Sequence, residues 1–124
     1  METVFIAGRI LFAALFLSSA FGHLTKTKEM GAYAASMGVP APQFMTFLTG
    51  LMILAGGLSV LFDFDVFLGA LLIVLFLIPT AFMMHAFWKV SDPMMKQFQQ
   101  VQFMKNLSLA GAALMFMYYS GGLH

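Results

Sequence analysis

Three polar residues beside long apolar segments could carry chemistry. His85 offers a titratable base, Lys105 a fixed positive charge, and Asn106 an amide that donates and accepts hydrogen bonds. Ionisable residues inside a bilayer are costly, so they mark candidate functional sites. Together these side chains suit the carbonyl of a quinone, a lipid headgroup or another anion. The sequence therefore predicts a ligand-binding site around them, although it identifies no catalytic residue.

Two further residues join this predicted site, His23 and Trp88. Trp88 follows His85 by three residues, so the two would share one face of a helix. Simpler interpretations stay open for each member of the set. The histidines suit a solvated membrane interface, Trp88 suits an interfacial anchor, and Lys105 could reach a lipid phosphate.

Arg9 is a polar intramembrane residue set apart from the others. It falls in the second turn of the first apolar segment. Its long side chain could reach the headgroups or pair with Asp63 or Asp65.

Several kinds of chemistry are excluded or disfavoured by composition. The chain has no cysteine, which excludes disulfides, thiol redox chemistry, covalent haem attachment and cysteine-ligated iron–sulfur clusters. His23 and His85 could ligate a haem, but both fall at helix ends and no pattern makes them face each other, so no metal site is predicted. No carboxylate lies inside an apolar segment, and no nucleophile–base pair is evident. Catalysis by this chain alone is therefore not predicted.

The elements that hold these residues are those of a membrane protein. Of the 124 residues, 61% are hydrophobic and 9% are charged, where a soluble domain carries roughly 25% charged residues. The mean hydropathy is +0.92. So small a chain could not bury that much apolar surface in water. The net charge of +1 provides no basic field for nucleic acid, so the lipid bilayer is the expected partner.

Four apolar segments approach the roughly 20 residues that a membrane-spanning helix needs. They fill almost the whole of residues 1–124, which predicts a single membrane domain of the all-α class: a four-transmembrane-helix bundle, up-and-down in topology. The predicted spans cover residues 4–21, 44–62, 66–87 and 104–120.

Short interfacial helices are predicted in the first and third connections. The first runs from Lys28 to Met37. Gly38 follows in the position typical of a helix C-terminal glycine, and two prolines come after it. The second begins at Pro93 after Ser91 and Asp92 and continues into the fourth span. In such a bundle the predicted ligand-site residues all fall at one membrane level, and Arg9 falls at the other.

Orientation follows from the lysines. The two longer connections carry most of the positive charge, so the positive-inside rule places them in the cytoplasm and both termini outside it.

Small residues predict which faces pack. Ala14, Ser18 and Gly22 recur every four residues in the first span. In the second span the small and polar residues share a face centred on Ile53. In the fourth span Lys105 falls on the side of the small residues. The face of the second span consists of Thr46, Thr49, Gly50, Gly56 and Gly57 around Ile53.

The segments AGRILFAALFLSSAFGHLTK, AYAASMGVPAP, GLMILAGGLSVL, HAFW and FMKNLSLAG occur in the order seen in DoxX-like membrane proteins, so the chain resembles that family over nearly its whole length. The resemblance implies a four-helix bundle in a bacterial-type inner membrane. It also implies that family positions match Arg9, His85, Lys105 and Asn106. One departure is Ile53, where many relatives have a glutamate that could meet the arginine.

Some DoxX relatives are linked to thiosulfate:quinone oxidoreduction and to membrane redox assemblies. The resemblance thus implies an accessory, non-catalytic subunit of a quinone-linked redox assembly, with quinone as the candidate cofactor and a homo-oligomer or a membrane redox protein as partner. Two alternatives stay open. One is a small carrier or binding protein for a lipid or apolar molecule, and the other is an oligomeric structural scaffold.

Overall fold

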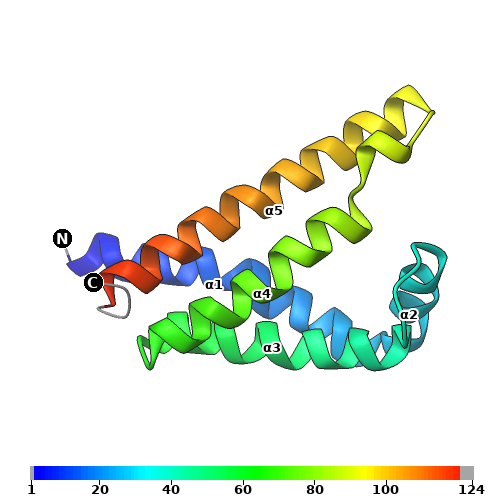
Figure 1. The fold of residues 1–124 in the computed structure, drawn as a ribbon. Coiled ribbons are helices and arrows are strands. Elements are labelled where there is room, and N and C mark those ends of the chain that lie inside the picture. The colour runs from blue at the N-terminus through cyan, green and yellow to red at the C-terminus, as the bar shows by residue number, and fades with distance from the viewer. Residues whose placement is uncertain (1, 121–124) are drawn as a thin grey trace.

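The computed structural model describes residues 2–120, which are almost entirely helical and contain no β-strand in that range (Figure 1). The predicted all-α class is confirmed. The elements in chain order are α1 Glu2–Thr25, α2 Thr27–Ser36, α3 Pro42–Phe62, α4 Val66–Met84, the 3-10 turn η1 Phe87–Lys89, and α5 Pro93–Tyr119.

Within residues 2–120, three helical segments are long and apolar enough to cross a membrane. They are Glu2–Thr25, Pro42–Phe62 and Val66–Lys89. The fourth predicted span lies within α5 and is not among them. The first ten residues of α5 include Lys96 and four glutamines, which make that helix more polar than the other three.

The helix boundaries follow local sequence signals closely. Helix α2 is displaced by one residue from its prediction and is followed by Gly38, whose φ of 85° favours glycine. Helices α3 and α5 both begin with proline, where the missing N–H costs nothing. Asp92 caps α5, because its carboxylate accepts a hydrogen bond from the Met95 N–H at 3.0 Å.

Helix α4 ends earlier than predicted. Its last residue is Met84, and the chain then bends through His85 before the η1 turn. The prediction that His85 and Trp88 share one helix face is therefore wrong. The bend lets Phe87 and Trp88 pack against Phe103 of α5, with ring centroids 5.5 Å apart in each pair.

The long helices pack in the order α1, α3, α4, α5, and α2 packs mainly on α3. The N-terminal end of α1, the end of α5 and the α3–α4 turn lie at one end of the molecule, here called the termini end (Figure 1). Helices α4 and α5 diverge from α1 and α3 toward the other end, here called the α2 end. The bundle is consequently wedge-shaped.

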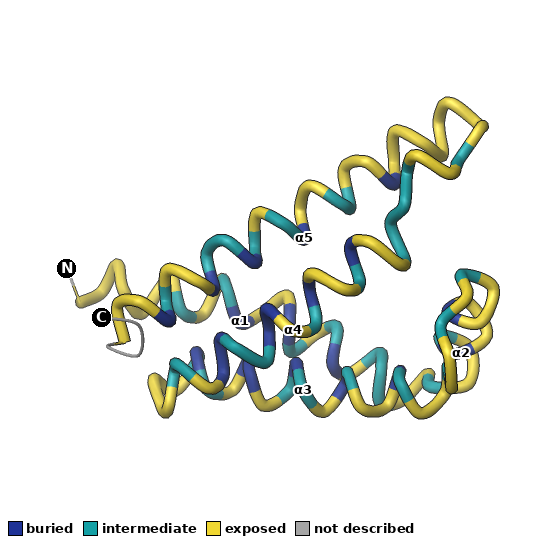
Figure 2. Tube along the Cα trace, in the orientation of Figure 1, coloured by how far each residue is buried: buried dark blue, intermediate teal, exposed yellow. Residues whose placement is uncertain are grey.

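The apolar core lies mostly between the termini end and the middle of the wedge. Buried positions run along the facing sides of the long helices, while the outer sides are exposed (Figure 2). The largest fully buried side chains are those of Phe16, Ile53, Ile73 and Leu77. Phe12 and Phe116 join α1 to α5 with ring centroids 4.8 Å apart.

The predicted packing face of α3 is confirmed, since Thr46, Gly50, Ile53, Gly56 and Gly57 are all buried. The predicted face of α1 is wrong. Ala14 and Ser18 are exposed there, and the buried residues are Ala13, Phe16 and Ala20.

Helices α3 and α4 make backbone-level contact. A Cβ atom at Gly56 would lie 2.6 Å from Cγ1 of Ile73 and 2.8 Å from the carbonyl oxygen of Gly69. A Cβ at Gly69 would in turn overlap the side chain of Ser59. Only glycine allows this approach, which is how small residues let helices associate in lipid.

Arg9 joins α1 to the end of α3. Its guanidinium donates hydrogen bonds to the carbonyl of Leu61 from Nε at 3.3 Å and from Nη2 at 3.0 Å. Nη1 lies 4.0 Å from the carboxylate of Asp63, which is one of the alternatives that the sequence left open. A cation at the carboxyl end of a helix is favourable because unpaired carbonyls gather there. Ile53 is about 12 Å of helical rise from Leu61, so Arg9 is held away from it.

Candidate functional site

A cavity of about 650 Å³ opens between the two sides of the wedge. Its volume is within the range of roughly 300–1,000 Å³ typical of small-molecule sites. All five helices contribute to its wall, which is mostly apolar and includes several methionines and phenylalanines. The polar residues on the wall are Ser19, His23, Glu29, Tyr33, Thr46, Thr49, Thr80, His85, Lys105 and Asn106.

The cavity brings together most of the residues singled out from the sequence. His23, His85, Lys105 and Asn106 all line it. Trp88 does not. It belongs to an aromatic cluster with Phe82, Phe87 and Phe103 and is 47% exposed.

His23 is oriented by α3. Its Nδ1 lies 3.2 Å from the carbonyl oxygen of Thr46 and 3.1 Å from Oγ1 of Thr49. The Thr49 hydroxyl donates its own proton to the carbonyl of Met45 at 2.7 Å, so both neighbours of Nδ1 act as acceptors. Nδ1 therefore carries the hydrogen. Gly50 permits this contact, because a Cβ there would lie 2.8 Å from Cβ of His23.

His85 forms part of a polar bridge across the α2 end of the cavity. Its Nδ1 lies 2.7 Å from Oε1 of Gln99 on α5. Nε2 of Gln99 donates to the hydroxyl of Tyr33 on α2 at 3.4 Å. Because the amide nitrogen faces Tyr33, the amide oxygen must accept from His85. The bridge connects the α1–α3 side of the wedge to the α4–α5 side.

Sequence reasoning missed Gln99 and Tyr33. A usable signal existed for the glutamine, since it precedes Asn106 by seven residues and so shares its helix face. Gln99 is only 4% exposed, although the neighbouring residues of α5 are exposed.

Asn106 has a buried side chain that makes no hydrogen bond within residues 2–120. It is 5% exposed and lines the cavity. Its amide atoms are nevertheless not sealed in, because no enclosed side-chain nitrogen or oxygen of the described residues lacks a partner. The amide therefore faces the cavity with its hydrogen-bonding capacity unused. The hydroxyls of Ser19 and Thr80, also on the wall, are unpaired within the same residues.

Lys105 lies at the rim. It is exposed, and its Nζ donates to Oε1 of Gln102 at 2.8 Å. The packing face of α5 passes instead through Asn106, Ala110 and Ala113. The sequence prediction that put Lys105 on the packing side is thus wrong by one residue.

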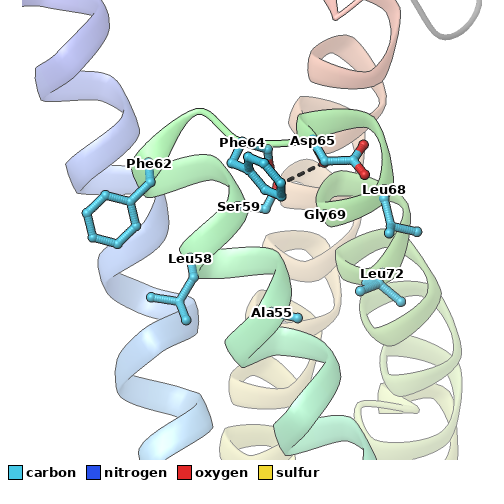
Figure 3. A pocket seen from close by; sticks show the side chains of 9 residues that line it. All are labelled: Ala55, Leu58, Ser59, Phe62, Phe64, Asp65, Leu68, Gly69 and Leu72. Carbon is cyan, nitrogen blue, oxygen red and sulfur yellow. Dashed lines mark hydrogen bonds between the residues drawn. The ribbon is translucent and has the colours of Figure 1, made fainter.

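A second hollow of about 460 Å³ lies between α3 and α4 at the termini end (Figure 3). Its wall is almost wholly apolar. The Ser59 hydroxyl on that wall is already within hydrogen-bond distance of the carbonyls of Phe64 at 2.6 Å and Asp65 at 3.0 Å. The other polar side chain on the wall is that of Asp65, an exposed residue, so this hollow has no buried polar side chain that could orient a ligand.

No group of three acidic or histidine side chains within residues 2–120 is arranged to hold a metal ion.

Comparison with known proteins places this chain in a family. The sequence model of the DoxX family matches residues 4–86. The chain belongs to the DoxX family. Inner membrane protein YqjF of Escherichia coli (strain K12) is 33% identical over 110 residues, which are 89% of this chain and 78% of that protein. No solved structure matches the chain.

The resemblance inferred from sequence motifs is therefore confirmed, and the chain is a DoxX-family integral membrane protein. The region that matches the DoxX model includes α1 to α4, with His23 and His85. It ends before α5, which carries Lys105 and Asn106.

Proposed function

We propose that this DoxX-family protein holds an apolar molecule in the cavity between the two sides of its wedge, as a non-catalytic subunit of a quinone-linked membrane redox assembly. The observation that carries the proposal is a cavity with an apolar wall and an unpaired amide, that of Asn106. Pockets with few polar groups on an apolar wall bind ligands that combine an apolar body with a polar head.

A quinone matches this wall. Its ring and tail would contact methionine and phenylalanine side chains, and a ring carbonyl would accept a hydrogen bond from the Asn106 amide. His85 lines the same cavity, and since its Nδ1 hydrogen is used by Gln99, its Nε2 would accept the O–H of the reduced, quinol form. The role assigned here is binding, since these groups orient a ligand and supply no nucleophile.

The proposal includes a fourth membrane span. Helix α5 packs along α4, and its second half is largely apolar from Leu107 to Tyr119. Four spans would put both termini on one side, and the lysine-bearing connections would face the cytoplasm. The inner membrane is the proposed location, because the E. coli relative is named as an inner membrane protein.

A carrier of lipid or another apolar molecule is the second candidate. It is favoured by the same cavity, because a site open between helices admits a ligand without requiring electron transfer.

Quinone content decides between these candidates. The protein would be purified in lipid nanodiscs, extracted with organic solvent and analysed for quinone, and then titrated with short-chain ubiquinone and menaquinone. Asn106→Leu and His85→Ala should each reduce binding, whereas Ser108→Ala, an exposed residue on the same helix, should not. No retained quinone and equal titrations for all variants would contradict the redox role. Flux of an apolar probe in proteoliposomes would then support the carrier.

A further inference from the structure

We infer that the cavity selects amphiphiles whose head group is uncharged and bears a hydroxyl, such as an alcohol or a quinol. This inference rests on the proposed function and specifies the ligand class of the same site. The argument depends on which hydrogen-bonding groups of the wall are unused and on where the charges lie.

The unused donors and acceptors lie on the wall of the same cavity. The rings of His23 and Phe76 meet with centroids 5.6 Å apart. Ser19 precedes His23 by one turn and Thr80 follows Phe76 by one turn, so their free hydroxyls lie about 6 Å of helical rise to either side. Asn106 adds an amide that donates and accepts. A head group in the cavity therefore has both donors and acceptors on the surrounding wall.

The histidines add acceptors. Nδ1 of His23 faces two acceptors, and Nδ1 of His85 faces the amide oxygen of Gln99. In the neutral imidazole the hydrogen is then on Nδ1, which leaves Nε2 as a bare acceptor on each ring. An acceptor of this kind is satisfied by the O–H of a ligand. A ligand that only accepts, such as an ester, would leave it unpaired, which is costly in a buried site.

Charge is confined to the rim. Lys105 and Glu29 line the cavity but are exposed, and the Lys105 ammonium group donates to Gln102, which is not on the wall. The deeper polar groups, those of Ser19, Thr80 and Asn106, are neutral. A carboxylate or ammonium head group moved among them would lose its hydration without gaining an ion pair. The wall therefore favours a neutral head.

A head-group series tests this selectivity. Tritiated hexadecanol would be bound to the purified protein in nanodiscs and displaced by unlabelled hexadecanol, palmitate, hexadecylamine or methyl palmitate. These share one sixteen-carbon chain and differ in charge or in the presence of an O–H. Hexadecanol should displace the probe at about tenfold lower concentration than the other three. Farnesol is measured as a further unlabelled competitor. Whichever of the two alcohols binds more tightly shows whether the cavity prefers an isoprenoid or an acyl chain as the apolar part of the ligand.

The variant for this test is Asn106→Leu, which keeps the side-chain size and removes the amide. It should weaken hexadecanol binding about tenfold, and Ser108→Ala should leave binding unchanged. If Asn106→Leu fails to fold, the series on the unaltered protein still gives the answer.

Palmitate or hexadecylamine equal to or tighter than hexadecanol would overturn the inference, as would methyl palmitate equal to it. Quinone binding could survive those results, in which case the proposed function stands without this selectivity. Absence of binding by every amphiphile and by quinone would overturn both.

Discussion

The two ends of this bundle are built from the same long helices and differ in what holds them together. At the termini end, α3 and α4 touch through Gly56 and Gly69, and Arg9 fastens α1 to the last turn of α3. At the α2 end, the two sides of the wedge are joined by the side chains of His85, Gln99 and Tyr33. Small residues allow backbone contact, and polar side chains span a gap. The difference indicates that stability resides mainly at the termini end, whereas the proposed ligand site lies toward the α2 end.

The largest effect on the contrast between the two ends should come from adding a side chain where α3 and α4 touch through glycine. Gly56→Ala places a methyl group against Ile73 and the Gly69 carbonyl, so it should lower the free energy of unfolding by about 1–3 kcal/mol. Gly111→Ala is the matched control, because no atom lies within 4 Å of its added Cβ. It should be neutral or stabilising by up to about 1 kcal/mol through helix propensity. Unfolding in mixed detergent micelles measures both, and equal stabilities would remove the distinction between the ends.

A somewhat smaller effect is expected from breaking the polar bridge. Gln99→Met keeps the side-chain length but removes the amide that joins His85 to Tyr33. The cost should be about 1–2 kcal/mol. Hydrogen exchange should accelerate in α2 and η1 while the termini end keeps its protection. Gln100→Met changes an exposed neighbour and should leave exchange unaltered. Faster exchange throughout the molecule would show that the bridge is not local to the α2 end.

Removing the Arg9 contacts should cost about 1 kcal/mol. Arg9→Gln deletes the ion pair with Asp63 and shortens the reach to the Leu61 carbonyl. Unfolding curves would measure the loss, and hexadecanol affinity should not change, because Arg9 is absent from the cavity wall. Lys89→Gln, at an exposed lysine, serves as the control. A loss of affinity in Arg9→Gln would couple the two ends.

The smallest effect is expected at the rim. Lys105→Gln should alter hexadecanol affinity less than about twofold, since the exposed ammonium group pairs with Gln102 and such pairs contribute little. The displacement assay described above measures it. An effect as large as that of Asn106→Leu would mean that the charge acts inside the cavity.

Much of this architecture was predictable because its signals are local. Proline, glycine and Asp92 mark where helices begin and end, and the alternating direction of the long helices brings His23, His85, Lys105 and Asn106 to the wall of one cavity. Three of the four predicted spans have the length and composition to cross a membrane.

The rotation of each helix about its own axis, which decides the residues that face the core, was harder to predict. In a chain that is 61% hydrophobic, apolar residues surround every helix and periodicity is weak. The predicted packing faces of α1 and α5 were accordingly wrong by one residue. Ala14 and Lys105 were predicted on the packing side, but Ala13 and Asn106 are the buried residues. The early end of α4 depends on contacts of Phe87 and Trp88 with Phe103, and the Gln99 bridge depends on Tyr33. Contacts between residues so far apart in the chain leave no local pattern.

The wedge also has a mechanical consequence. Helix α5 has 27 residues and is therefore about 40 Å long. If α5 tilted by about 5° about the termini end, its far end would move by about 3 Å over that length. A displacement of that size would pull apart the Gln99–Tyr33 hydrogen bond, already 3.4 Å long. A small tilt of α5 at the packed end thus produces a large displacement at the other end, where it would widen the mouth of the proposed ligand cavity.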